Sequence, residues 1–242
     1  FIGSHVCDKL LTLDHKVVCL DNFNDYYDPQ IKRKNISHNL ENPNYFLEEV
    51  DIIDVDNLKK IFLKHKINKV IHLAARAGVR PSIKEPQLYF DVNVSGTQNL
   101  LDLSRQYNVK TFILGSSSSV CGNNKKIPFS EEDKVDNQVS PYAATKKCGE
   151  VLCNSYSQLF DINIVCLRFF TVYGPRGRID MAPYKFTKLI SEGKTIEMYG
   201  DGSSRRDYTY VEDIVSGIIS ALDKNYKFEI IKYLEKEGYK VL

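Results

Sequence analysis

A tyrosine and a lysine four residues apart offer the clearest chemistry in this sequence. Tyr142 and Lys146 lie in the stretch Ser140–Lys147, and positions four apart occupy the same face of a helix. Pro141 suits the first helical turn, and Ser140 before it is a good N-cap. We expect both side chains to point out of the core, where the ammonium favours the phenolate and lowers the pKa of the tyrosine. The pair is therefore a candidate proton-transfer site.

Four consecutive serines, Ser116–Ser119, lie upstream of this pair. They follow the apolar segment 110–115, which we expect to be a buried strand. Side chains at the carboxyl end of a parallel strand lie where open α/β sheets bind ligands. The alternative for the serine run is an ordinary polar loop, and the alternative for Tyr142 and Lys146 is a pair of solvated helix residues. The strand before the serines and the helix after them favour a functional site.

Composition limits the class of protein and its partners. The 242 residues are 43% hydrophobic and 26% charged, enough for one large core or for a domain with a smaller lobe. The net charge is +2 and no basic block stands out, which argues against nucleic acid and anionic membrane as partners. The six cysteines lack paired spacing, which fits reduced thiols in a cytoplasmic protein better than disulfides or a metal site. Because the chain begins at Phe1, a lost targeting segment stays an open alternative.

Strand and helix patterns alternate along the chain. Apolar segments at 16–20, 45–50, 69–73, 110–115 and 162–167 predict strands, and helical patterns lie at 1–13, 55–65, 86–107, 141–160, 183–192 and 211–222. A further short strand is expected near 196–199, and residues 229–242 have a helix-then-strand pattern. This alternation predicts an α/β fold with a doubly wound parallel sheet.

An acidic residue ends the first predicted strand. A helix that feeds a strand ending in Asp21 is typical of the second half of a dinucleotide-binding βαβ unit. A carboxylate there accepts hydrogen bonds from ribose hydroxyls and repels the extra phosphate of NADP, so the pattern favours NAD. Gly3 would be the last of the fingerprint glycines, and the first strand and leading glycines are not in the sequence. The alternative for Asp21 is a plain turn residue.

Several segments together resemble extended short-chain dehydrogenase/reductase proteins of the NAD-dependent nucleotide-sugar epimerase/dehydratase family, and within it the UDP-glucuronate 4-epimerases. The segments that carry the resemblance are 1–5, 20–29 (LDNFNDYYDP), 72–80 (HLAARAGVR), 116–122 (SSSSVCG), 141–147 (PYAATKK), 167–175 (LRFFTVYGP), 180–182 and 200–213. Three departures are the missing glycine loop before Phe1, the unfamiliar segment 229–242, and Cys121 where tyrosine is usual.

The resemblance implies a fold and a division into domains. The fold would be a Rossmann-like sheet lacking its first strand, with a small incomplete C-terminal substrate lobe. Residues 1–170 would form the N-terminally truncated NAD-binding domain, and residues 171–242 the lobe, whose helix 211–222 packs back on the first domain. The protein would be a homodimer through the helices 86–107 and 141–160, each with apolar surface to spare.

The resemblance also assigns roles to residues. Tyr142 would be the general base and acid, Lys146 would bind the nicotinamide ribose, and a serine between Ser117 and Ser119 would bind the sugar C4 oxygen. The residues expected to line the cofactor are Ile2, Gly3, Asp21, Asn22, Asp51, Ile52, Leu73, Ala74, Ala75, Asn93 and Ser116, together with Tyr142 and Lys146. Those expected to bind substrate are Arg80, Ser118, Thr171, Arg178 and Arg206, with Arg206 on the nucleotide diphosphate.

The expected reaction is the NAD-dependent 4-epimerisation of a UDP-sugar, from UDP-glucuronate to UDP-galacturonate. Dehydratases and decarboxylases of this family carry an acidic residue in the serine stretch before Val120. This chain has serines there, so the resemblance favours epimerisation over elimination. Arg178 would read the sugar carboxylate, because arginine offers paired donors to it, with Arg176 as a competitor for that role. The alternatives are a UDP-glucose/galactose 4-epimerase and a non-enzymatic NAD-binding fragment or pseudoenzyme.

Overall fold

The computed structural model describes residues 1–124, 126, 129–197, 200–201 and 207–232. Within this part the chain forms two compact units, and neither is a single run of sequence. The first unit comprises residues 1–17, 23–46 and 170–216, and the second comprises 18–22, 47–169 and 217–242. One division between the units therefore falls after Phe169, next to the expected domain boundary, and the division into an NAD-binding and a substrate domain stays a prediction.

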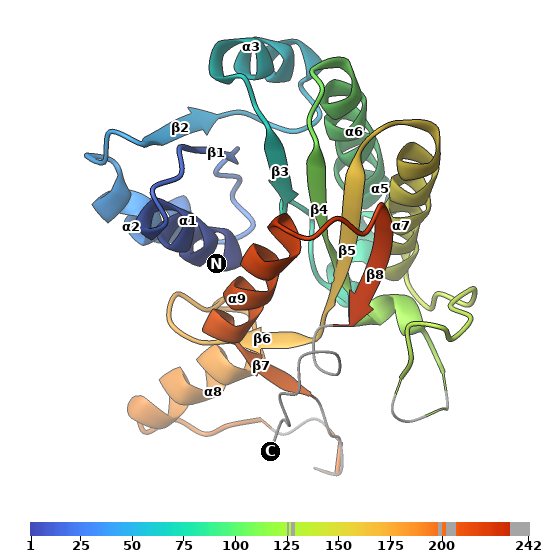
Figure 1. Cartoon of the computed structure of the whole chain (residues 1–242). Coiled ribbons are helices and arrows are strands. Elements are labelled where there is room, and N and C mark those ends of the chain that lie inside the picture. Colours follow the sequence, from blue (N-terminus) through green and yellow to red (C-terminus); the bar gives the residue numbers. More distant parts are fainter. Residues whose placement is uncertain (125, 127–128, 198–199, 202–206, 233–242) are drawn as a thin grey trace. The chain divides into compact units, whose positions relative to one another are not determined.

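The second unit is built on a four-stranded parallel sheet. Its strands are β3 (Lys69–His72), β4 (Thr111–Ser117), β5 (Asn163–Phe169) and β8 (Phe228–Lys232), which lie side by side in the order β3-β4-β5-β8 (Figure 1). The register pairs Ile71 with Ile113 and Ile113 with Val165. Because all the strands run the same way, their carboxyl ends meet at one edge of the sheet.

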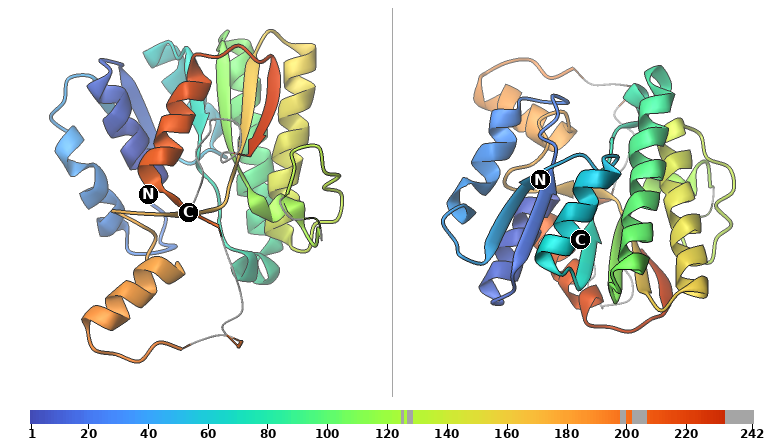
Figure 2. Two further views of the ribbon diagram at one scale, coloured as in Figure 1. Left: turned by 60° about the horizontal axis from the view of Figure 1, so that its bottom comes forward. Right: turned by 90° about the horizontal axis from the view of Figure 1, so that it is seen from above.

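Two long helices cover one face of this sheet. The helices α6 (Gly96–Gln106) and α7 (Pro141–Leu159) lie side by side along it, with α3 (Val55–His65) beyond α6 (Figure 2). Ser140 caps α7 as expected, since its Oγ accepts a hydrogen bond from Ala143 N at 3.1 Å. Asp54 likewise caps α3 through Asn57 N at 3.2 Å.

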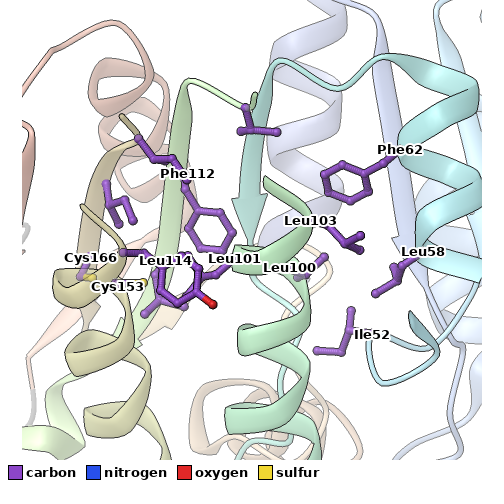
Figure 3. Close-up of a cluster of buried hydrophobic side chains, with 14 residues drawn as sticks. Ile52, Leu58, Phe62, Leu100, Leu101, Leu103, Phe112, Leu114, Cys153 and Cys166 are labelled. Atoms are coloured by element: carbon purple, nitrogen blue, oxygen red, sulfur yellow. The ribbon is translucent and has the colours of Figure 1, made fainter. Parts of the chain in front are cut away.

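The core of this unit lies between the sheet and these helices. Leucines of α6 point between side chains of α3 and side chains of β4 (Figure 3). The buried residues labelled there are Ile52, Leu58, Phe62, Leu100, Leu101, Leu103, Phe112, Leu114, Cys153 and Cys166. Burial of this apolar surface drives the packing of α6 and α7 on β4, and so fixes where the start of α7 lies relative to the strand ends.

The segment 86–107 differs from the single α-helix that we expected. It comprises α5 (Pro86–Phe90), a π-helical turn at Asp91–Ser95, and then α6, and the short helix α4 (Val79–Lys84) precedes it. Such π turns occur frequently at functional sites. Asn93 lies within this one, and its buried amide makes side-chain contacts of the kind that override local helix propensity.

The first unit contains helices and one small parallel sheet. Its elements are α1 (Ile2–Thr12), α2 (Pro29–Ile36), a 3₁₀ turn at Ser37–Asn39, β6 (Thr171–Tyr173), α8 (Ala182–Ser191) and β7 (Tyr208–Tyr210). β6 pairs with β7 in parallel. Three elements are divided between the units, namely β1 (Val17–Asp21) and β2 (Tyr45–Glu49), which form a two-stranded sheet, and α9 (Val211–Leu222).

The structure confirms the α/β class with a parallel sheet and corrects two details. The serine run does not begin after the strand, since Ser116 and Ser117 are the last residues of β4. The expected helix at the start of 229–242 is wrong, because Phe228–Lys232 is a strand paired with β5, with Ile164 opposite Phe228. Residues 195–197 form no regular element, and the rest of the strand expected at 196–199 and residues 233–242 lie outside the described residues.

Two general features concern the described residues only. None of their helices is both long and apolar enough to cross a membrane. Within the same residues, no cluster of three or more histidine, cysteine, aspartate or glutamate side chains is arranged to hold a metal ion.

Candidate functional site

The carboxyl ends of β3 and β4 bring several of the predicted residues together. Leu73, Ala74 and Ala75 follow β3, and Ser116 and Ser117 are the last residues of β4, two and three residues beyond Leu114, which pairs with His72. Ala74 is exposed, while Leu73 and Ala75 are half-buried. The small side chains of the two alanines suit a ligand that lies close to the backbone, and their contact with a cofactor stays a prediction.

The ends of β1 and β2 are joined by predicted site residues. Asn22 Nδ2 donates to Asp51 Oδ2 at 2.6 Å, and Ile53 N donates to Asp51 Oδ1 at 3.1 Å. Asp51 thus shapes its own loop, and Ile52 in that loop is buried. Asp21, the last residue of β1, is half-buried and lies directly before Asn22.

Lys146 is the central charged group of the site. Its side chain is 8% exposed, and its Nζ donates to the carbonyl oxygen of Gly115 on β4 at 2.6 Å. Burial lowers the pKa of Lys146 to about 8, so most of it still carries a proton at neutral pH. The expectation that the lysine points out of the core is therefore wrong, because α7 lies directly against β4 at this turn.

Tyr142 is the second residue of α7, one turn before Lys146, and is half-buried. The ring of Tyr89 from α5 meets the ring of Tyr142 edge-on, with centroids 6.3 Å apart and planes at 85°. Tyr89 itself is 1% exposed and donates its hydroxyl to Ala77 O at 2.6 Å, which fixes its ring. The orientation of Tyr142 is therefore set by packing as well as by the helix.

Asn93 ties the start of α7 to the segment after β3. Its Nδ2 donates to Arg76 O and to Thr145 Oγ1, each at 3.0 Å, and its Oδ1 accepts from Arg76 N at 2.7 Å. Thr145 Oγ1 in turn donates to Tyr142 O at 2.9 Å. The predicted contact of Asn93 with a cofactor stays a prediction, since here its amide holds the surrounding backbone.

A buried histidine extends this network below the site. His72 Nε2 lies 2.9 Å from Thr97 Oγ1, and Thr97 Oγ1 donates to Asn93 O at 2.6 Å. Burial, and then the charge of Lys146, lower the pKa of His72 to about 3. His72 is therefore neutral over the physiological pH range, and its ring has a structural role through its hydrogen bond rather than a role as an acid.

The four serines have different surroundings. Ser116 Oγ donates inward to Glu150 Oε1 at 2.7 Å. Ser117 Oγ accepts from Ser119 N at 3.2 Å, which caps the 3₁₀ turn Ser118–Cys121 and leaves its hydroxyl hydrogen available to donate. Ser118 and Ser119 are half-buried. The catalytic role expected of Ser117 and Ser119 stays a prediction.

The first unit contains other predicted residues. Ile2 and Gly3 open α1, and Thr171 opens β6. Arg178 makes a bidentate contact with Asp180, with Nε–Oδ1 at 3.1 Å and Nη2–Oδ2 at 2.5 Å. In the second unit, Arg80 is exposed on α4. Arg206 lies outside the described residues.

Sequence reasoning missed several residues around Tyr142 and Lys146. These are Tyr89, Thr145, Glu150, Arg168 and His72. Glu150 had a usable signal, because it falls four residues after Lys146 and therefore on the same helical face. Arg168 and His72 had none, since the position of a polar or charged residue in a strand does not show which side chain it will contact.

These observations define the class of protein as a Rossmann-like α/β protein with a tyrosine–lysine pair at the carboxyl edge of its sheet. Comparison with known families agrees, since residues 1–232 match the model of the NAD dependent epimerase/dehydratase family, and the chain belongs to it.

Individual relatives narrow the comparison. The UDP-glucuronate 4-epimerase of Thermodesulfobacterium geofontis is 44% identical over 231 residues, which cover 96% of this chain and 71% of the relative. The Bacillus cereus UDP-glucuronic acid 4-epimerase in complex with UDP-glucuronic acid and NAD superposes with a TM-score of 0.89 at 39% identity, over 98% of this chain and 75% of that one. The Thermotoga maritima UDP-glucose 4-epimerase with UDP-glucose gives 0.86 at 31%, over 96% and 73%.

The residues at the sheet edge fit a dinucleotide. An ammonium group has three N–H donors. Lys146 donates one of them to Gly115 O, and the other two can be donated to hydroxyl groups such as those of a ribose. Ala74 and Ala75 offer little side-chain bulk beside it, and Asp21 ends β1 with a carboxylate. Both ends of an NAD molecule therefore have chemically suitable partners.

Proposed function

We propose that this chain catalyses the NAD-dependent 4-epimerisation of a UDP-sugar, converting UDP-glucuronate to UDP-galacturonate. The observation that carries the proposal is the buried ammonium of Lys146, bonded to the end of β4 and one helical turn from Tyr142. Membership of the NAD dependent epimerase/dehydratase family and the likeness to UDP-glucuronate 4-epimerases support it.

When bound, NAD supplies the reversible oxidation of the C4 alcohol of the sugar. Asp21 would accept hydrogen bonds from the adenosine ribose, and its charge disfavours a 2′-phosphate. Asp51 and Ile52 would face the adenine, Leu73 to Ala75 would lie along the dinucleotide, and Lys146 would hold the nicotinamide ribose. Ile2 and Gly3, at the start of α1, would lie against the phosphates.

The proton transfer belongs to Tyr142. As a phenolate it takes the proton of the C4 hydroxyl. As a phenol it returns a proton to the C4 oxygen after the 4-keto sugar has rotated in the site. The ammonium of Lys146 favours the phenolate, and its contact with Gly115 O keeps that charge at the start of α7. Ser117 or Ser119 would donate a hydrogen bond to the same oxygen.

Substrate recognition would rest on hydroxyls and arginines. Ser118 and Thr171 would bind sugar oxygens, Arg178 the carboxylate and Arg206 the diphosphate, and Arg80 would also contact the substrate. A second candidate is UDP-glucose/galactose 4-epimerisation, which the likeness to the Thermotoga maritima enzyme favours. The two differ in whether the substrate has a carboxylate, and so in the role of Arg178.

We also propose that the protein is a homodimer. Exposed apolar side chains lie on the helices that the sequence analysis assigned to an interface, with Phe90 of α5 49% exposed and Val151 of α7 54% exposed. A second copy of the same chain would cover both.

The central test is Tyr142→Phe in the full chain. We expect turnover of UDP-glucuronate with NAD to fall by at least about a hundredfold, because the phenyl ring cannot carry the proton. The control is Tyr156→Phe on the same helix, whose hydroxyl donates to Asp102 Oδ1 at 2.7 Å between α7 and α6. Near-normal turnover of Tyr142→Phe, with the control also active, would contradict the proposal.

A further inference from the structure

A buried ion pair includes Glu150, which lies one helical turn after Lys146 on α7. Arg168 of β5 donates to Glu150 of α7 through both Nε and Nη2, at 2.8 Å and 2.9 Å. Their side chains are 3% and 1% exposed. Burial raises the pKa of Glu150, but the hydrogen bonds and charge of Arg168 lower it by more. The pKa of Glu150 therefore lies below its ordinary value, and Glu150 is ionised at neutral pH.

This pair also holds the end of β4. Ser116 Oγ donates to Glu150 Oε1 at 2.7 Å, and Ser116 lies opposite Arg168 in the parallel register of β4 and β5. The residue before it, Gly115, accepts the bond from Lys146 at 2.6 Å. Two successive residues of β4 are therefore fastened to two successive turns of α7, by Lys146 and by Glu150.

Stability alone is a weak reason for such a pair. Removing two charges from water costs several kcal/mol per ion, and apolar side chains of similar volume are often as stabilising. A bidentate pair does fix geometry, because both hydrogen bonds of the guanidinium have one direction. Here that geometry determines where Ser116 lies, and Ser117 and the 3₁₀ turn follow immediately.

We propose that Glu150 and Arg168 are positioning residues for the Tyr142–Lys146 pair, which hold the end of β4 against α7 so that Lys146 stays charged and in place one helical turn after Tyr142. This inference rests on the proposed function and assigns to the pair no contact with substrate or cofactor.

The electrostatics of Lys146 support this role. The titratable groups that interact with its charge are Glu150 and Cys153 from α7, Cys166 from β5 and His72 from β3. Burial lowers the pKa of Lys146, and the charges of Cys166, Glu150 and Cys153 would offset it. The thiol of Cys166 is protonated at neutral pH, since burial raises the pKa of Cys166 well above its ordinary value. The negative charge of Glu150 thus favours the charged form of Lys146.

The first test variant is Glu150→Gln, which retains an acceptor for Ser116 but removes the negative charge. We expect kcat to fall about tenfold or more while KM for the UDP-sugar stays within about threefold. We expect the pKa of Lys146 to fall by roughly one unit. NMR of the labelled lysine ammonium groups in the cofactor-free chain measures this, with Lys146→Met to assign the signal.

The second variant separates positioning from stability. In Glu150→Met/Arg168→Met the pair is replaced by apolar side chains of similar length, and stability in urea is expected to match the wild type. We expect kcat and the Lys146 titration to remain impaired, because neither the clamp on Ser116 nor the anion is restored. Tyr156→Phe is the control, with an unchanged Lys146 titration.

The outcomes separate this inference from the proposed function. If the double variant is folded and has the kcat and Lys146 pKa of the wild type, the pair is only structural and the inference is overturned. If the wild-type chain does not epimerise UDP-sugars but Glu150→Gln still lowers the Lys146 pKa, the proposed function fails while the positioning role stands. If Glu150→Gln does not fold, the double variant decides the question.

Discussion

Lys146 and His72 show how burial sets the charge of individual residues near the site. Both are at least nine-tenths buried, and burial opposes a positive charge on either. Lys146 keeps its proton at neutral pH with a carbonyl partner and a nearby carboxylate, whereas His72 is left neutral between Thr97 and the lysine. The tyrosine–lysine spacing can be read from the sequence, but these charge states cannot, because they depend on how deeply each side chain is buried in the folded chain.

His72 leads to a prediction on acid stability. Its pKa is about 3 in the folded chain and about 6.5 in the unfolded chain. Between these values the unfolded state binds a proton that the folded state does not, so the free energy of unfolding falls as pH falls from about 6.5 towards 3. We expect this group alone to cost about 2–3 kcal/mol between pH 7 and pH 4.5.

The measurement is urea unfolding at these two pH values. His72→Gln should lose less stability than the wild type over this range, because it lacks the titrating ring. His15→Gln, at an exposed histidine, should match the wild type. An equal loss in His72→Gln and the wild type would mean that His72 does not stay neutral in the fold.

Arg178 leads to a prediction on substrate choice. Its guanidinium fork is occupied by Asp180, a carboxylate that mimics the carboxylate of a uronate sugar. Arg178→Ala should lower kcat/KM for UDP-glucuronate about ten- to a hundredfold more than for UDP-glucose, since a hydrogen bond to a charged group contributes about 1.5–3 kcal/mol. Asp180→Asn should lower KM for UDP-glucuronate alone, because it removes the competing carboxylate.

Arg176→Ala is the matched control for these kinetics. Arg176 was the competing candidate for the carboxylate, but it donates to Asp8 Oδ2 at 2.7 Å and to Ser4 Oγ at 3.2 Å, both on α1. Its loss should affect the two sugars alike. A similar loss for both sugars in Arg178→Ala would assign the carboxylate to another residue.

The helices and strands were predictable wherever local signals agreed with tertiary packing. The bounds of α3 at Val55–His65 and the cap of α7 at Ser140 follow from hydrophobic spacing and cap residues. The π turn at Asp91–Ser95 had no local signal, because it accommodates contacts that Asn93 makes with other elements. The strand Phe228–Lys232 was misread as a helix, since its strand character comes from pairing with β5.

Gly96 leads to a prediction on the packing of α6. A Cβ at this position would lie 2.5 Å from Ile52 Cδ1 and 2.7 Å from Ile52 Cγ1, which is too close. Gly96→Ala should therefore destabilise the fold by about 1–3 kcal/mol through overpacking, partly offset by about 1 kcal/mol of helix propensity. Urea unfolding measures the change.

Ile52→Val provides the matched test, because it removes Cδ1, the closer of the two atoms that would collide. The double variant should be more stable than the sum of the two single changes by at least about 0.5 kcal/mol, since the residues are in contact. Strict additivity would show that the loop around Ile52 moves away from α6 at no cost. Because Ile52 is also expected to line the cofactor, weaker NAD binding in Gly96→Ala alone would agree with that role.

At the scale of the molecule, family resemblance predicted more than residue patterns did. Alternating strands and helices predicted the parallel sheet, and the position of Asp21 suggested NAD, but the sugar substrate came from the resemblance alone. Neither source identified the Glu150–Arg168 pair or the Arg178–Asp180 contact. Partners of charged side chains are chosen by proximity in the folded chain, and a single sequence does not state which charges meet.

The proposed homodimer is the last prediction, and it concerns apolar surface. Phe90 on α5 and Val151 on α7 are about half exposed, and Leu159 at the end of α7 is 73% exposed. Leaving such side chains in water is unfavourable by about 25 cal/mol per Å² of apolar area, which a partner subunit would recover.

We expect the full chain to sediment at twice the chain mass of 27.8 kDa at micromolar concentration. Val151→Glu combined with Phe90→Glu should shift it to the monomer, because burying unpaired carboxylates is costly. The control is Leu63→Glu on α3, an equally apolar side chain with 64% exposure that lies off these helices, and it should leave the dimer intact. A monomeric wild-type chain would contradict the homodimer, and a dimer that all three substitutions leave unchanged would place its interface elsewhere than on α5 and α7.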